Sequence, residues 1–208
     1  MTGKPTIHVI GTGGTISGAG SSATAAAYES GQVEASELVA EVEGLSQVPS
    51  IETENLFATG SENLGPVQWR ILARRIEELT KSRDVDGVVV THGTDTLEEA
   101  SFFLDLVCKP SKPVVLTAAM RPATALSADG PANLYQAILA AASPQLKGHG
   151  ILLVMNGTVI PGWQAIKTDS AALESFCAYP NGIIGRISGE RLIVSSGSCP
   201  FPLSGRFQ

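Results

Sequence analysis

The chain has few of the residues on which metal proteins and disulfide-rich proteins depend. Among 208 residues there are only 3 cysteines and 3 histidines. Cys108, Cys177 and Cys199 are widely spaced and odd in number, so they predict neither a CxxC metal site nor a disulfide framework. The histidines are isolated from one another, which argues against a histidine-based metal site. We therefore expect no bound metal.

Positive charge and long apolar runs are also scarce. The formal net charge is −6, and the absence of a basic patch argues against a nucleic-acid partner. No apolar run is long enough to cross a membrane, so we expect no membrane partner. A strand pattern begins within a few residues of Met1, where a secretory signal would lie. This predicts a cytoplasmic protein, or a mature periplasmic domain if Met1 is engineered.

One stretch organises what is present. Val88–Val90 is an uninterrupted run of valines, typical of a parallel strand buried on both faces. Polar residues follow at Thr91, and a helical pattern of apolar residues then runs from Leu97 to Val107. Thr94 and Asp95 therefore lie between the carboxyl end of a strand and the start of a helix. In open α/β sheets, ligands bind at such positions.

The rest of the chain alternates strands and helices in the same way. This predicts an α/β fold, a doubly wound and mostly parallel sheet flanked by helices. We expect strands over 6–10, 51–58, 88–91, 113–118 and 150–155, with helices over 34–45, 66–81, 97–107 and 132–142. On the second helix, Arg74 with Glu78 and Glu77 with Lys81 are expected to form ion pairs. Residues 183–187 and 191–194 predict a C-terminal β-hairpin, followed by a linker-like tail.

Three strand ends carry hydroxyls and acids, around Thr15, Ser61 and Thr94–Asp95. Because the carboxyl ends of parallel strands share one edge of a sheet, these residues predict a small-molecule site. A simpler interpretation is that Thr94 or Asp95 is only a helix N-cap, since both residue types cap helices well.

The first of these strand ends is rich in glycine, which raises a second alternative. A dinucleotide-binding G-x-G-x-x-G turn would need glycine at position 16, where the chain has Ile16, and no long helix pattern follows. The small residues from Ala19 to Ala27 instead suggest a mobile loop or lid. Tyr28, just beyond them, is either a packing aromatic or a functional phenol. Lys167 stands alone in a short polar segment, where a lysine is usually a solvated charge.

Two long motifs then carry a family resemblance. The segments 12–16 (TGGTI) and 91–96 (THGTDT) resemble the two signatures of the bacterial L-asparaginase/glutaminase family. Further matches in the same order lie at 60–61, 120–122, 127–135, 154–156 and 167–168. The agreement extends from about residue 6 to 190. It implies hydrolysis of L-asparagine to L-aspartate and ammonia through a threonine acyl-enzyme, with L-glutamine as a second substrate.

The resemblance implies a role for each matching residue. Thr15 corresponds to the nucleophile, Tyr28 to the lid tyrosine that contacts it, and Thr94, Asp95 and Lys167 to a second catalytic triad. Substrate binding falls to Gly14, Ser61, Glu62, Thr94 and Asp95, and His92 is expected to give structural support. Backbone N–H groups near Gly14 and Thr94–Asp95 are expected to form an oxyanion hole. No cofactor is needed, and the family implies a homo-oligomer.

The resemblance covers only part of a family member. It implies an N-terminal α/β domain over 1–190, with 191–208 as the end of the hairpin and an interdomain linker. In the family, a smaller C-terminal domain follows and supplies an acidic residue to the ammonium pocket of a neighbouring subunit. We therefore expect little or no activity from this chain by itself. The alternative function is a catalytically incomplete domain of the same fold that binds an amino acid.

Overall fold

An eight-stranded, mostly parallel sheet forms the centre of the molecule. The structure is a computed structural model that describes residues 4–24, 27–45 and 50–195. The strand order is β12-β11-β8-β7-β6-β5-β1-β4, in which β4, β1, β5, β6 and β7 are parallel to one another. The strands are β1 Thr6–Gly13, β4 Ser50–Thr59, β5 Gly87–Thr91, β6 Val114–Thr117, β7 Ile151–Met155, β8 Thr158–Pro161, β11 Gly185–Ser188 and β12 Arg191–Val194. The predicted α/β fold class is confirmed.

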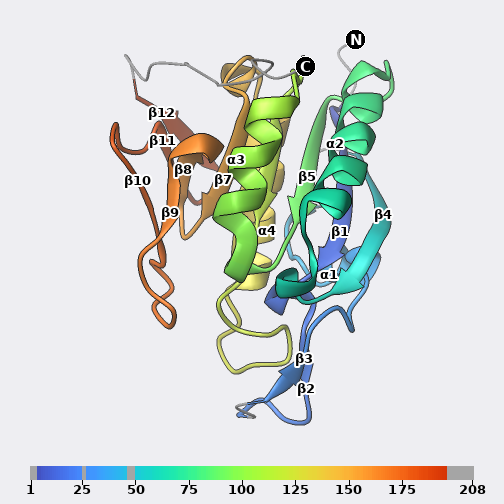
Figure 1. Cartoon of the computed structure of the whole chain (residues 1–208), viewed down its shortest axis with the longest axis vertical. Helices are drawn as coiled ribbons and strands as arrows, with labels where there is room; N and C mark the ends of the chain where they lie inside the picture. Colours follow the sequence, from blue (N-terminus) through green and yellow to red (C-terminus); the bar gives the residue numbers. More distant parts are fainter. Residues whose placement is uncertain (1–3, 25–26, 46–49, 196–208) are drawn as a thin grey trace.

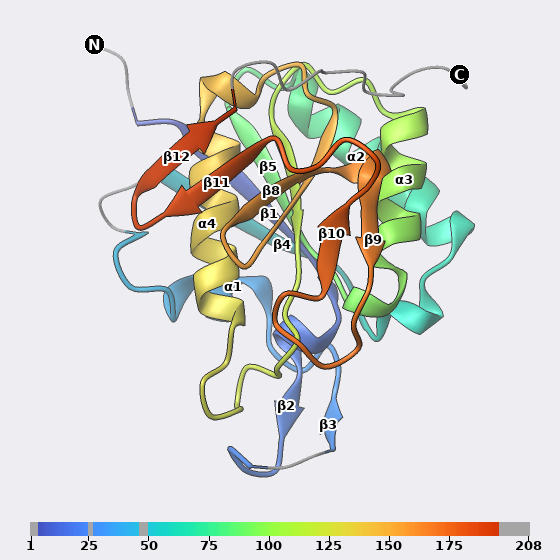
Figure 2. The same cartoon turned by 90° about the vertical axis from the view of Figure 1, so that its left-hand side faces the viewer.

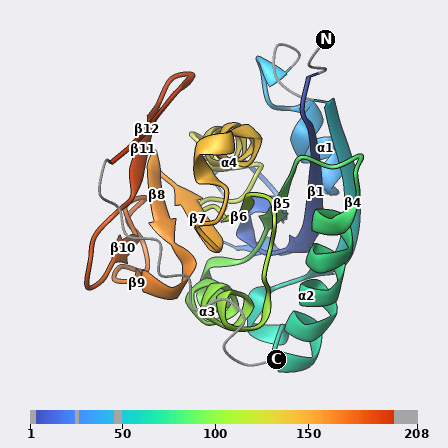
Figure 3. The same ribbon diagram turned by 90° about the horizontal axis from the view of Figure 1, so that it is seen from above.

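Helices cover both faces of this sheet, as Figure 3 shows. α2 (Pro66–Lys81) and α3 (Leu97–Val107) lie on one face, and α1 (Ala35–Ala40) and α4 (Gly130–Ala142) lie on the other. Successive side chains of a strand point to opposite faces, so β5 supplies Val89 to one core and Val88 and Val90 to the other. All of β5 is buried, as expected for a central parallel strand.

The chain changes direction across the sheet at β1. From β1 it goes to β4 on one side, and it then returns to β5 on the other side of β1. A doubly wound sheet opens a crevice at such a switch, outside the carboxyl ends of the two strands. Residues that directly follow β1 and β5 are therefore brought together here.

The antiparallel part of the sheet begins with a tight turn after β7. Asn156 (φ 47°) and Gly157 (φ 72°) connect β7 to β8, and two residues with positive φ are what a two-residue hairpin turn requires. β11 then pairs with β8 and with β12, so the predicted C-terminal hairpin is present. The expected linker-like tail lies outside the described residues from position 196 onward.

Two small hairpins lie apart from the main sheet. β2 (Ala19–Gly20) pairs with β3 (Tyr28–Glu29), and β9 (Ala165–Lys167) pairs with β10 (Phe176–Ala178). The β2–β3 hairpin projects beyond the carboxyl ends of the parallel strands, whereas β9 and β10 lie beside α3 (Figures 1 and 2). Neither pairing was expected from the sequence, because strands of two or three residues are too short to show a period.

Some predicted bounds differ from the observed ones. β1 continues through the glycines to Gly13, which pairs with Thr59 after an irregularity in the register. α1 ends at Ala40 rather than near residue 45, and α4 begins two residues earlier than expected, at Gly130. Glycine gives little local signal for either helix or strand, which explains the errors at Gly13 and Gly130.

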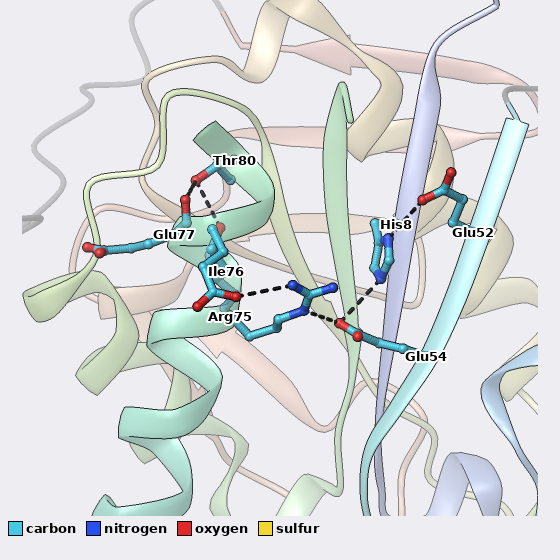
Figure 4. Close-up of polar contacts among 8 residues, drawn as sticks. His8, Glu52, Glu54, Arg75, Ile76, Glu77 and Thr80 are labelled. Carbon is cyan, nitrogen blue, oxygen red and sulfur yellow. Dashed lines mark hydrogen bonds and ion pairs between the residues drawn. The ribbon is translucent and has the colours of Figure 1, made fainter. Parts of the chain in front are cut away.

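A group of charged side chains links α2 to the outer strands of the sheet (Figure 4). Arg75 Nε donates to Glu54 Oε1 (2.7 Å), and the buried His8 lies 3.3 Å from both Glu52 and Glu54. The Glu54 carboxylate raises the pKa of the Arg75 guanidinium. Glu78 pairs with Arg75 at 3.1 Å, so the expected Arg74–Glu78 pair is wrong. The expected Glu77–Lys81 pair is present, at 3.5 Å.

The two cysteines in the described residues differ sharply. Cys108 is buried, and this burial raises the pKa of its thiol to about 12. Cys177 is exposed.

Within the described ranges, the helices are all too short or too polar to span a bilayer, and no three His, Cys, Asp or Glu residues are grouped as a metal site would need.

Candidate active site

A polar cavity of about 200 Å³ opens at the switch between β1 and β5. Seven of the eight site residues predicted from the sequence contribute to it. Its lining consists of Gly14, Thr15, Tyr28, Ser30, Ser61, Glu62, Gly93, Thr94 and Asp95, with no aliphatic side chain among these described residues. Lys167, the eighth, reaches the cavity through hydrogen bonds to Thr94 and Asp95. The surroundings suit a small polar ligand with charged groups.

Thr15 stands at the end of β1, where glycines allow a sharp turn. Gly13 (φ 98°) and Gly14 (φ 82°) both have positive φ, a conformation that other residues rarely adopt. A Cβ atom on Gly14 would lie 2.3 Å from the Cα of Gly93, so only glycine lets the β1 and β5 loops approach this closely. Thr15 then begins a short 3₁₀ turn (Thr15–Ser17) and is 8 % exposed.

The hydroxyl of Thr15 lies 2.7 Å from the hydroxyl of Tyr28. Tyr28 belongs to β3, and β3 is held by β2, so the small hairpin brings the phenol back over the end of β1. The ring is 39 % exposed and covers one side of the cavity. Of the two interpretations of Tyr28 left open by the sequence, the geometry favours a functional phenol over a packing aromatic.

Lys167 connects β9 to the loop after β5. Its Nζ donates to Thr94 Oγ1 (2.9 Å) and to Asp95 Oδ1 (2.8 Å). The Lys167 side chain is 18 % exposed and the Asp95 side chain 68 % exposed. Because Thr94 Oγ1 accepts from lysine, its own hydroxyl hydrogen is free to point elsewhere, toward the cavity. Lys167 is therefore not the simple solvated charge that a lone lysine usually is.

The N-cap interpretation of Thr94 and Asp95 is wrong. Both residues lie inside a 3₁₀ turn (Thr94–Thr96) whose N-cap is Gly93, and the N-cap of α3 is Thr96. Neither cap position makes a side-chain capping bond. The side chains of Thr94 and Asp95 are thus available for the bonds to Lys167.

The third polar strand end closes the cavity on the β4 side. Ser61 and Glu62 lie in a 3₁₀ turn (Ser61–Asn63) directly after β4. Ser61 is 2 % exposed, and its carbonyl accepts from Thr96 Oγ1 (2.9 Å), which ties this turn to the loop after β5. Glu62 is exposed at the cavity, and its Oε1 accepts from Asn63 Nδ2 (3.2 Å).

Only part of the expected oxyanion hole is available in this geometry. The N–H of Gly14 already donates to Thr59 O (2.9 Å), so it is not free to bind an oxyanion. The N–H groups of Thr94 and Asp95 open a 3₁₀ turn and have no acceptor within it. Donors from this second loop fit the role better than Gly14 does.

His92 lies beneath the cavity and is fully buried. Burial lowers the pKa of its imidazole, and its Nδ1 lies 2.8 Å from Gly93 O. A neutral, buried ring that contacts the backbone of the β5 loop fits the structural role expected for it.

Sequence reasoning missed three residues that contribute to this region. Ser30 lines the cavity from the turn directly after β3, and Gly93 lines it from the β5 loop. Glu98, in the first turn of α3, accepts a hydrogen bond from the backbone N–H of Lys167. Gly93 was within a recognised motif, but the contacts of Ser30 and Glu98 left no local signal.

The chain is similar to known proteins along most of its length. A family model described as "Asparaginase, N-terminal" matches residues 6–198. The chain is 41 % identical to L-asparaginase 2 of Bacillus subtilis over 187 residues, which are 89 % of this chain and 50 % of that protein. It is 42 % identical to the glutaminase-asparaginase of Pseudomonas fluorescens over 182 residues, 87 % of this chain and 50 % of that protein.

The fold also matches a solved structure. A probable cytoplasmic L-asparaginase from Campylobacter jejuni superposes with a TM-score of 0.89 at 36 % identity, covering 93 % of this chain and 59 % of that one. The chain spans about half the length of the curated relatives it matches.

Proposed function

Because the chain belongs to the asparaginase family, we propose that it provides the catalytic cluster of an amidohydrolase that converts L-asparagine to L-aspartate and ammonia. One observation carries this proposal. The Thr15–Tyr28 hydroxyl pair and the Lys167–Thr94–Asp95 cluster border the same small polar cavity. A hydroxyl nucleophile needs a hydrogen-bonded partner to remove its proton, and Tyr28 is in contact with Thr15.

In the first half of the reaction, Thr15 Oγ1 attacks the side-chain amide carbon of asparagine. The oxygen of that carbonyl gains negative charge, which the N–H groups at Thr94 and Asp95 would stabilise. Collapse of the tetrahedral intermediate breaks the carbon–nitrogen bond and forms an ester on Thr15. The proton lost by Thr15 is relayed through the Tyr28 hydroxyl and leaves with the amide nitrogen as ammonia.

In the second half, water hydrolyses the ester. The hydroxyl of Thr94, which accepts from Lys167 and has its own hydrogen free, would orient this water. Water adds to the ester carbon, the bond to Thr15 Oγ1 breaks, and Thr15 regains its proton as aspartate forms. Lys167 and Asp95 hold Thr94 in place throughout.

The charges around the cavity fit an amino acid. The Asp95 carboxylate accepts one bond from Lys167 and retains capacity for further donors, so it suits the α-ammonium group. Ser61 and Glu62 line the same cavity and would hold the rest of the α-amino-acid part. This arrangement leaves the side-chain amide to point toward Thr15.

The direct test is ammonia release from L-asparagine. We expect the 208-residue chain by itself to release ammonia at least about 100-fold more slowly than when mixed with the separately produced C-terminal half of the Bacillus subtilis relative, because the chain spans only half of that relative and we propose that the other half completes substrate positioning. We also expect the chain to assemble into a homo-oligomer, which light scattering would measure. Full-rate hydrolysis by the monodisperse chain alone would refute the need for a second domain.

Glu62 offers a prediction about substrate choice. Its carboxylate adds negative charge beside the proposed ammonium site, which we propose permits some turnover of L-glutamine. Glu62→Gln removes this charge and is expected to lower the ratio of glutaminase to asparaginase kcat/KM by about 2- to 5-fold, the value of one modest ionic contact. Glu29→Gln, a change at an exposed carboxylate of the β3 strand, is the control. An unchanged ratio in Glu62→Gln would exclude this role.

The alternative is a domain of the same fold that binds an amino acid without hydrolysing it. Binding of an amino acid by Asp95, Ser61 and Glu62 would fit that function as well as it fits catalysis. It predicts binding of L-asparagine by calorimetry with no ammonia released, with or without the C-terminal half of a relative.

A further inference from the structure

Lys167 is held at two points by one short segment of the chain. Its side-chain Nζ donates to Thr94 and Asp95, in the turn just before α3. Its backbone N–H donates to Oε2 of Glu98, in the first turn of that helix. The start of α3 therefore fixes both the main chain of Lys167 and the far end of its side chain.

The main-chain bond matters because the strand that carries Lys167 does not belong to the main sheet. β9 pairs only with β10, in a separate two-stranded sheet. In Figures 1 and 2 this hairpin lies beside α3. Contacts with α3 therefore help to set its position relative to the cavity.

Glu98 and Ser101 hold the two ends of the segment that leads to Lys167. The hydroxyl of Ser101, one turn further along α3, donates to Gly162 O (2.9 Å), five residues before Lys167. Ser101 is fully buried, and Glu98 is half-buried. Of these two bonds, the bond that Glu98 accepts involves Lys167 itself. It joins a backbone donor to a charged acceptor, which is a strong type of hydrogen bond.

We propose that Glu98 is a positioning residue of this site. Its carboxylate fixes the backbone of Lys167 so that the ammonium group meets Thr94 and Asp95. The effect of Glu98 on the reaction rate rests on the proposed function. Its effect on the position of Lys167 does not depend on hydrolysis. The other explanation is that Glu98 only interacts with the helix dipole, as a carboxylate at the start of a helix does. Glu99 is the adjacent, exposed carboxylate and shares that dipole effect, so it is the matched control.

The first readout needs no substrate. The side-chain ammonium signal of Lys167 is identified in the ¹⁵N-labelled 208-residue chain as the signal that disappears in Lys167→Met. We expect Glu98→Ala to shift or broaden this signal and to speed hydrogen exchange of the Lys167 backbone amide by about 10-fold or more, since an amide without its partner opens more readily. Glu98→Gln keeps an oxygen acceptor and should preserve both signals, as should Glu99→Ala.

The second readout is kinetic, in the chain completed by a relative's C-terminal half. We expect Glu98→Ala to lower kcat by about 10- to 100-fold with KM changed less than about 3-fold, and Glu98→Gln to restore most of the rate. If no variant hydrolyses asparagine, the proposed function fails while the spectra still decide the role of Glu98. Unchanged Lys167 signals in Glu98→Ala, or equal changes in Glu99→Ala, would overturn the inference.

Discussion

Replacing Thr15 with alanine is expected to reduce ammonia release from L-asparagine on the order of 10⁴-fold, because the nucleophile of a covalent mechanism acts as a unit with its partners. Thr15 is nearly buried at the end of β1, and its side-chain hydroxyl makes a hydrogen bond with Tyr28. Removal of the hydroxyl should therefore change the melting temperature little. Steady-state ammonia assays and thermal unfolding on the same preparations measure both effects.

Two variants make the Thr15 result specific. Thr15→Ser keeps a hydroxyl on Cβ and should retain measurable activity. Ser17→Ala removes a neighbouring hydroxyl that bonds to Gly14 O within the same 3₁₀ turn and should leave the rate within about 5-fold of the parent, since its bond is local and structural. If Thr15→Ala and Ser17→Ala lowered the rate equally, the loss would report on the shape of the turn and not on a nucleophile.

Lys167→Met is expected to cause the second large loss. The substitution keeps most of the length of the side chain and removes the donor to Thr94 and Asp95. We expect kcat/KM to fall on the order of 10²-fold, because Thr94 and Asp95 would no longer be held in position. Asp95 is largely exposed, so the lost ion pair should cost little stability.

Lys81→Met is the matched control for the Lys167 prediction. Lys81 pairs with Glu77 on the exposed face of α2 and has no contact with the cavity. Its substitution should leave the kinetics unchanged. Activity of Lys167→Met within about 10-fold of the parent would contradict a role for the lysine in the reaction, since misplacement of a reacting group costs more than that.

The framework of the fold follows from patterns that are local in the sequence. Val88–Val90 was identified as a central strand because no polar residue interrupts it, and its burial confirms this. The meeting of Thr15, Ser61 and Thr94 followed from one physical rule, that the carboxyl ends of parallel strands share one edge. The rule predicts that these residues meet, but not which atoms touch.

The contacts that complete the site join residues far apart in sequence or lie on very short elements. Lys167 bonds to Thr94 across 73 positions, and nothing in the polar segment around it predicts that partner. Its role came from the family resemblance and not from the pattern. The small residues from Ala19 to Ala27 were expected to form a mobile loop or lid. The structure pairs Ala19–Gly20 with Tyr28–Glu29, and strands of two residues leave no pattern in the sequence. The Glu98 bond was missed for the same reason, because it spans 69 positions.

The most direct measurement is the location of a covalent intermediate. The chain, completed by a relative's C-terminal half, is mixed with L-asparagine, quenched in acid within the first turnovers, digested and examined by peptide mass spectrometry. The account predicts an aspartyl ester on the peptide that contains Thr15 and none in Thr15→Ala. An aspartyl group on another hydroxyl, such as that of Thr94, or one that persists in Thr15→Ala, would contradict it.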